Sequence, residues 1–114
     1  MKIAFSSSDN SPAACLDPRF GRCAYFAIYD SDTFQTEFVP NPHRDAPEGA
    51  GPASVQFILE WGICKVVSGA FGFKVQKILE ELEIQPIALG NEKRTIEDCI
   101  GMLFPSSDRE EITG

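Results

Sequence analysis

The hydrophobic pattern of the second half of the chain changes period repeatedly, and this constrains the fold most. Apolar residues recur at helical spacing in two segments, 52–62 and 71–82. Each segment is followed by a short apolar run, Ile63 to Ser68 and then Ile84 to Leu89, which predicts a strand. Helices that alternate with strands imply parallel pairing, because parallel strands need a long crossover connection and a helix supplies it.

The first half of the chain has the pattern of antiparallel strands. Lys2 to Ser6 is a short apolar run ended by polar residues, and Cys23 to Asp30 is dense in aromatic and β-branched residues. The turn residues Ser31-Asp32 lead into the alternating segment 34–38, so we expect a β-hairpin that flanks the first strand. The segment 41–51 contains prolines and glycines without apolar periodicity, which predicts a mobile loop.

A last helical stripe runs from Ile96 to Leu103 and follows Thr95, a residue type typical of helix N-caps. The predicted order is therefore β-β-β-α-β-α-β-α, a single α/β domain in which the hairpin extends the parallel part of a mixed sheet. We expect the domain to span residues 1–104 and residues 105–114 to form a polar C-terminal tail.

Composition excludes several classes of protein. The 114 residues suit one domain, and 17 acidic against 10 basic residues give a net charge of -7, which disfavours nucleic acid and anionic membranes as partners. The four cysteines are widely spaced, as in a protein of a reducing compartment. The chain shows no signal peptide and no apolar run of about 20 residues, so we expect a cytoplasmic protein.

The sequence lacks the catalytic motifs of the enzyme classes considered, nucleases and nucleophilic hydrolases. A two-metal nuclease needs carboxylates on the first strand, whereas Asp9 lies beyond it. The only histidine, His43, accompanies no nucleophile motif. We therefore predict a protein that is not an enzyme.

Four motifs together resemble one known family. They are Asp17-Pro18-Arg19-Phe20-Gly21-Arg22-Cys23, then Asn41-Pro42, then Gly49-Ala50-Gly51 before one helix, and Ser68-Gly69-Ala70-Phe71-Gly72 before the next. Over residues 1 to about 104 the chain resembles the dinitrogenase iron-molybdenum cofactor biosynthesis domains, the NifX and NifB C-terminal family. The resemblance implies a ribonuclease H-like mixed sheet, in agreement with the element order.

The same resemblance implies a function. It points to a binding or carrier protein for an iron-sulfur or molybdenum-containing cluster, or its precursor, in metallocofactor biosynthesis, with cofactor-assembly proteins as partners. Cofactor-binding members often have histidine where this chain has Arg19, and a cysteine where it has Cys23. Arginine has no lone pair to give a metal, so only electrostatic contact with an anionic cluster remains at that position.

Cys23 and His43 are the candidate metal ligands. Thiolates are the usual ligands of iron-sulfur clusters, and we expect the neighbouring Arg19 and Arg22 to lower the pKa of Cys23. The alternative is that Cys23 is a small core residue. His43 lies in the predicted loop, which we expect to close over a ligand as a lid; the alternative is an exposed histidine without a role.

Glycine-rich turns precede two of the predicted helices, where free N–H groups and the helix dipole attract anions. Plain turn geometry explains each turn taken alone. Ligands of such sheets gather beyond the carboxyl ends of the parallel strands. The polar residues that end the first strand are therefore added as supporting candidates. The candidate cofactor-binding residues are Ser7, Asp9, Arg19, Phe20, Gly21, Arg22, Cys23, His43, Gly49, Gly51, Gly69 and Gly72.

A second hypothesis is a metal-free protein-protein interaction or regulatory module of the same fold. Arg19 in place of the family's histidine keeps it open. Metal analysis and a visible spectrum of protein purified without oxygen separate the two hypotheses, because a thiolate-bound cluster absorbs visible light.

Overall fold

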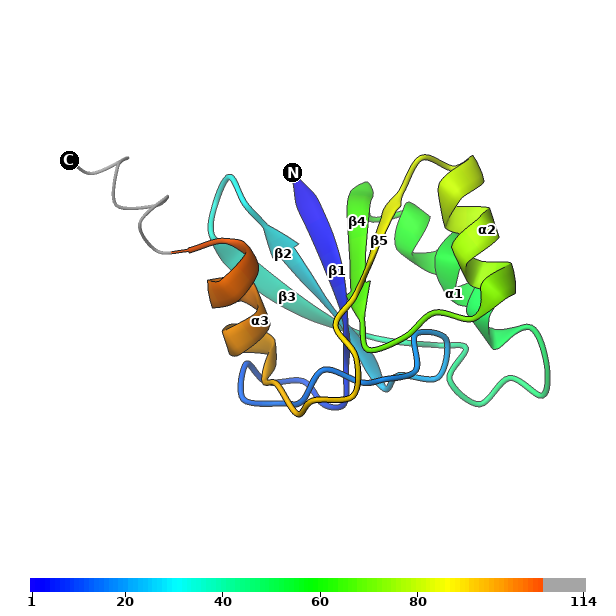
Figure 1. Ribbon diagram of the computed structural model, residues 1–114, viewed down its shortest axis with the longest axis horizontal. Helices are drawn as coiled ribbons and strands as arrows, with labels where there is room; N and C mark the ends of the chain where they lie inside the picture. Colours follow the sequence, from blue (N-terminus) through cyan, green and yellow to red (C-terminus); the bar gives the residue numbers. More distant parts are fainter. Residues whose placement is uncertain (106–114) are drawn as a thin grey trace.

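A five-stranded mixed sheet organises the chain in the computed structural model, which describes residues 1–105 (Figure 1). In chain order the elements are β1 (Lys2–Ser7), β2 (Tyr25–Asp30), β3 (Gln35–Pro40), α1 (Ala50–Leu59), β4 (Ile63–Ser68), α2 (Phe73–Glu81), β5 (Gln85–Ala88) and α3 (Ile96–Leu103). This order confirms the predicted one. Beyond Pro105, the predicted C-terminal tail lies outside the described residues.

The strands lie in the order β3-β2-β1-β4-β5. The β2–β3 hairpin pairs antiparallel with β1, whereas β4 pairs parallel with β1 and β5 pairs parallel with β4. The hairpin therefore flanks the first strand, as the sequence predicted. Because β1 and β4 run in the same direction, their carboxyl ends meet at one edge of the sheet.

Helices cover both faces of the sheet (Figure 1): α1 and α2 pack on one face and α3 on the other. Alternation along the strands supplies the two cores. Ala4 faces the first core together with Ile58 of α1 and Leu79 of α2, whereas its neighbour Phe5 faces the second core with Ile96 of α3. The loops at the carboxyl edge are thereby held between two packed layers.

The helix boundaries shift slightly from the predicted ones. Helix α1 begins at Ala50, two residues before Pro52, and α2 begins at Phe73, because Phe71 packs against the ring of Phe20 instead. Thr95 caps α3 as predicted, its Oγ1 accepting the Asp98 amide at 3.1 Å. Within residues 1–105, no helix has the length and apolar character that crossing a membrane requires.

Candidate functional site

Three segments far apart in sequence line one cleft of about 630 Å³ at the carboxyl edge of the sheet. They are the loop 18–22, the turn 49–52 at the start of α1, and residues 70–75 at the start of α2. Ligands in sheets of this kind collect beyond the carboxyl ends of the parallel strands. The cleft is therefore the candidate functional site.

The loop that carries Arg19 is fixed to the sheet through Asp17. The carbonyl oxygen of Asp17 accepts hydrogen bonds from the Ser6 hydroxyl at 2.9 Å, the Ser68 hydroxyl at 3.2 Å and the Gly69 amide at 3.2 Å. Ser6 is the last residue but one of β1 and Ser68 is the last residue of β4, so both parallel strands hold this loop. The backbone that leads to Arg19 is therefore held by hydrogen bonds from the ends of two neighbouring strands.

Close backbone approach joins the loop to α1. A Cβ atom built at Gly21 would lie 2.7 Å from the Cα of Gly51, which is backbone rather than a flexible side chain. A Cβ atom at Gly51 would in turn collide with the side chain of Val75 on α2. Glycine is needed at both positions because the loop backbone, the α1 backbone and the Val75 side chain pack with no room for a Cβ atom.

Both helices that face the cleft begin without a side-chain cap. Gly49 and Gly72 occupy the N-cap positions of α1 and α2, and neither first turn contains an acidic residue. The first N–H groups of an α-helix have no intrahelical acceptor, and the helix dipole adds partial positive charge. Two such termini therefore present hydrogen-bond donors to one cleft, fewer of them at α1 because Pro52 in its first turn has no N–H.

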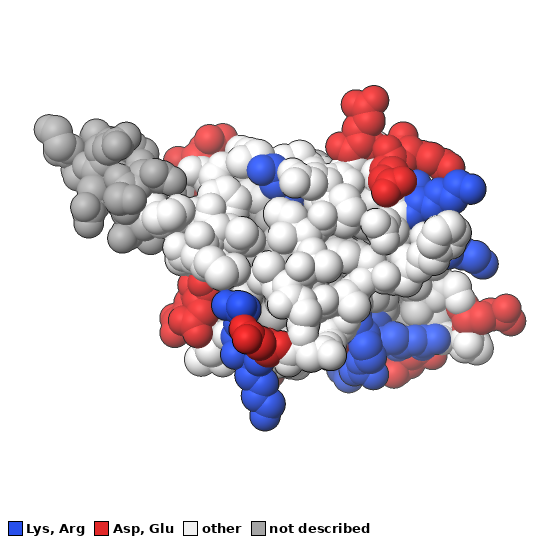
Figure 2. Space-filling view, viewed as in Figure 1, with Lys and Arg blue, Asp and Glu red and all other residues white. Residues whose placement is uncertain are grey.

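Cationic side chains add to this positive potential. Arg19, Arg22 and Lys74 line the cleft. Figure 2 shows Lys and Arg side chains gathered below α1 and α2, on the side where these loops lie. The Arg19 side chain is 67% exposed, and its Nε lies 3.4 Å from Asp17 Oδ1, which also accepts the Arg19 backbone amide at 2.8 Å. Asp17 therefore orients Arg19 while leaving most of the guanidinium in solvent.

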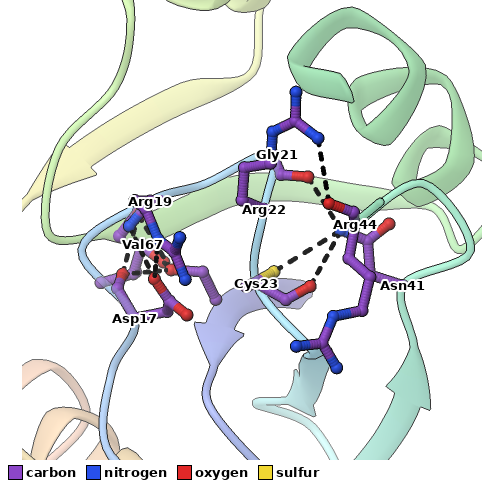
Figure 3. A network of polar contacts seen from close by, with 10 residues as sticks. Asp17, Arg19, Gly21, Arg22, Cys23, Asn41, Arg44 and Val67 are labelled. Atoms are coloured by element: carbon purple, nitrogen blue, oxygen red, sulfur yellow. Dashed lines mark hydrogen bonds and ion pairs between the residues drawn. The ribbon is translucent and has the colours of Figure 1, made fainter. Parts of the chain in front are cut away.

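Buried Asn41 connects the cleft loop to the 41–49 segment (Figure 3). Its side-chain amide donates to the carbonyl oxygens of Gly21 and Cys23, both at 3.1 Å. Its Oδ1 accepts the His43 amide at 3.0 Å and the Ser54 hydroxyl at 3.4 Å. The segment that the sequence predicted to be a mobile loop is thus tied down at its start.

Cys23 lies in the core rather than in the cleft, so its assignment as an accessible metal ligand is corrected. It is 0% exposed, packs with the α1 and α2 face of the sheet, and its sulfur lies 3.9 Å from the Asn41 amide nitrogen. Burial, followed by the charge of Asp17, raises the pKa of its thiol to about 12. The expected lowering of this pKa by Arg19 and Arg22 is wrong, because burial and the charge of Asp17 both raise it.

The buried Cys23 thiol leads to a prediction on reactivity. In the folded protein, exposed Cys15 should react with a thiol reagent at neutral pH, and Cys23 only at the rate of unfolding. Above pH 9.0 the unfolded chain loses the Cys23 proton while the folded chain keeps it up to about pH 12, so stability should fall as pH rises through this range. Labelling kinetics of a Cys15→Ser variant, followed by mass spectrometry, measure the reactivity directly; rapid labelling of Cys23 would contradict its burial.

The remaining predicted residues take other places. His43 borders a separate hollow with Gln56 and Glu60, and its ring lies 6.4 Å from that of Phe57. Ser7 and Asp9 form a turn after β1, where the Ser7 hydroxyl donates to the Asp9 carbonyl oxygen at 2.6 Å.

Gly69 lies behind the cleft wall, where a Cβ atom would meet Pro18 Cα at 2.6 Å. Across residues 1–105, no three His, Cys, Asp or Glu side chains are grouped so as to hold a metal ion.

Seven of the candidate residues come together in the structure as lining of the cleft: Arg19, Phe20, Gly21, Arg22, Gly49, Gly51 and Gly72. Sequence reasoning missed Asp17 and Asn41 as organisers, and it did not include Lys74 among the residues of the site. The Asp-Pro-Arg order was a usable signal for Asp17, because an aspartate side chain commonly accepts the amide two residues ahead.

Comparison with known proteins assigns the family. A family model for the dinitrogenase iron-molybdenum cofactor matches residues 1–105. The chain belongs to the dinitrogenase iron-molybdenum cofactor family. The family resemblance seen in the sequence is confirmed, and with it the association with iron-molybdenum cofactor biosynthesis. No curated protein sequence matches the chain.

Solved structures agree with this family assignment. The apo form of the orange protein from Desulfovibrio gigas is similar with a TM-score of 0.81 and 26% identity, over 94% of this chain and 88% of that one. A candidate NifB protein from Thermotoga, of the DUF35 family, is similar with a TM-score of 0.74 and 25% identity, over 90% of this chain and 85% of that one. The likeness thus extends over nearly the whole family domain.

Proposed function

We propose that the cleft binds a preassembled anionic metal cluster, of iron-sulfur or molybdenum-containing type, or a precursor of it, and that the protein carries it during cofactor biosynthesis. One observation carries the proposal: two uncapped helix N-termini open into the same cleft as Arg19 and Lys74. The family assignment and the likeness to a protein solved in an apo form support it.

The chemistry of the cleft favours anions over bare metal ions. Guanidinium, ammonium and backbone N–H groups donate hydrogen bonds and have no lone pair for a metal. Phe20, Phe71 and Pro52 add apolar walls, which suit a polarisable sulfide-rich surface. The cluster would therefore arrive with its own ligands complete and be held by charge, hydrogen bonds and shape.

The free energy that each single contact contributes is small, so these groups must act together. An anion at one helix N-terminus gains about 0.3–1 kcal/mol, and a charge-assisted hydrogen bond contributes about 1.5–3 kcal/mol. The net charge of -7 repels anions at long range, although salt screens it beyond about 8 Å. Only the convergence of several donors in one cleft gives useful affinity, so specific binding should depend on this cleft alone.

The wider proposal has three further parts. The role is binding and release rather than catalysis, and the partners are the assembly proteins that supply or accept the cluster in the cytoplasm. The sheet is of the ribonuclease H-like type, which the order β3-β2-β1-β4-β5 with one antiparallel hairpin supports. The domain spans residues 1–104, which the family match over residues 1–105 supports.

A binding experiment tests the proposal. Anaerobic protein is titrated with tetrathiomolybdate, and separately with ferrous iron and sulfide, then desalted, and the retained metal and visible absorption are measured. We expect retention of at least one of these probes near one equivalent, with weaker retention at high salt and little retention of molybdate, a more strongly hydrated oxyanion. Colourless, metal-free protein after both titrations would overturn the proposal and favour the metal-free interaction module.

A further inference from the structure

The two arginines of the cleft loop make different contacts, and we propose that Arg22 is a positioning residue that holds the α1 wall of the cleft. This inference rests on the proposed function, because the wall it positions is one side of the anion site. Arg19 is then the arginine that meets the ligand, although both residues line the cleft.

The contacts of Arg22 are to backbone. Its Nη1 donates to the carbonyl oxygens of Arg44 at 3.1 Å and Ala46 at 2.5 Å. Both acceptors lie in the segment that joins β3 to α1 and ends at Gly49, the N-cap of α1. A guanidinium that bridges two carbonyls therefore fixes the approach of the chain to a helix terminus that faces the cleft.

Further contacts act on the same connection. The Ser54 hydroxyl of α1 donates to the Gly21 carbonyl oxygen at 3.3 Å, beside the 3.1 Å bond from Asn41. The backbone on either side of Arg22 is thus bonded to Asn41 at the start of the 41–49 segment and, through Gly21, to Ser54 of α1 beyond its end. Arg22 holds the middle of the segment (Figure 3). Loss of the Arg22 contacts should loosen the middle of the segment without unfolding its ends.

Arg19 differs from Arg22 in its contacts, which leave most of its side chain in solvent. Its side chain is 67% exposed, and its Nε donates to the carboxylate of Asp17, two residues before it. A lysine at position 19 would keep the charge that an anion meets. A lysine at position 22 would also keep the charge, but its ammonium lies one bond nearer the backbone than Nη1, the single atom that donates to both the Arg44 and the Ala46 carbonyl, so it falls short of them.

Charge-preserving variants test the inference. Arg22→Lys, Arg19→Lys and the control Arg44→Lys are compared, since Arg44 supplies only its backbone carbonyl to the Arg22 contact. Amide hydrogen exchange of residues 43–48 is measured with and without tetrathiomolybdate, together with the affinity for this probe at several salt concentrations.

We expect Arg22→Lys to speed exchange in residues 43–48, to remove the protection that the probe gives these amides, and to weaken binding by about tenfold. Its salt dependence should match that of the unchanged protein, because the number of charges meeting the anion is the same. Arg19→Lys should bind within a few-fold of the unchanged protein, and Arg44→Lys should alter neither measurement.

Three results separate failure of the positioning role from failure of the proposed function. If the unchanged protein binds the probe and Arg22→Lys binds it equally well, the positioning role is wrong while the proposed function stands. If Arg22→Lys weakens binding without altering exchange in residues 43–48, Arg22 acts on the ligand directly and the inference is again wrong. If the unchanged protein retains neither tetrathiomolybdate nor an iron-sulfide cluster, the proposed function fails and the positioning role fails with it.

Discussion

Arg19→Glu is expected to weaken tetrathiomolybdate binding by about a hundredfold or more. A charge-assisted hydrogen bond is lost, at about 1.5–3 kcal/mol, and a carboxylate that repels the anion takes its place. Each 1.4 kcal/mol changes the affinity tenfold. The affinity is measured by anaerobic titration at low salt, where electrostatic terms are largest.

Lys77→Glu is the matched control for this charge reversal. It changes the net charge by the same amount, but Lys77 lies on the outer face of α2, beside Gln76 and Glu80, in a separate hollow. Its effect on the affinity should be within a few-fold. Equal losses in the two variants would show that the overall field of the protein, rather than the cleft, governs binding.

Arg19→His asks whether this position meets the ligand by charge or by metal ligation. A histidine imidazole has an ordinary pKa of about 6.5, so it is cationic below about pH 6.5 and neutral above it. If the contact is electrostatic, the variant should bind tetrathiomolybdate more tightly as pH falls through this range. A metal-ligating histidine would show the opposite trend, because protons compete with the metal for the ring nitrogen.

Gly21→Ala is expected to lower the free energy of unfolding by about 1–3 kcal/mol, the usual cost of overpacking. The added methyl group would lie 2.7 Å from backbone atoms of Gly51, so the cleft loop and α1 must separate. The same separation should weaken anion binding, because it moves the α1 terminus away from Arg19.

Gly72→Ala is the control for this substitution. Gly72 also lines the cleft, but a Cβ atom there meets nothing within 4 Å and its φ of -65° suits any residue. Its free energy of unfolding should fall by less, about 0.5–1 kcal/mol, because alanine is a poorer N-cap residue than glycine but meets no clash. Urea unfolding of both variants measures the difference; equal stabilities would show that the approach of Gly21 to Gly51 is not required by the fold.

Local sequence signals were sufficient for the elements but not for the roles of particular residues. The period of the apolar residues gave the helices and strands in their observed order, and Thr95 marked the start of α3. The boundary of α2 was wrong by two residues, because Phe71 was counted into the helical stripe although it packs against Phe20 in the cleft. Spacing alone does not distinguish an apolar residue of a helix from one of the loop before it.

Arg19, Arg22 and Cys23 show what only the tertiary structure decided. The sequence grouped them because they are neighbours, and their charges suggested an activated thiolate. In the fold, Arg19 is exposed, Arg22 is bonded to carbonyls more than twenty residues away, and Cys23 is buried among residues of the sheet and α1. The environment of each side chain depends on which distant segments pack against it, and burial reversed the direction of the Cys23 pKa.

The sequence by itself therefore determined the layered α/β architecture, its family and the edge of the sheet where a ligand would bind. These follow from short-range periodicity and from motifs that are contiguous in the chain. Only the tertiary structure decided that the site is an electropositive cleft without an accessible cysteine, and that Asp17 and Asn41 organise it. The physical reason is that burial, hydrogen-bond partners and electrostatic potential are set by contacts between segments far apart in sequence.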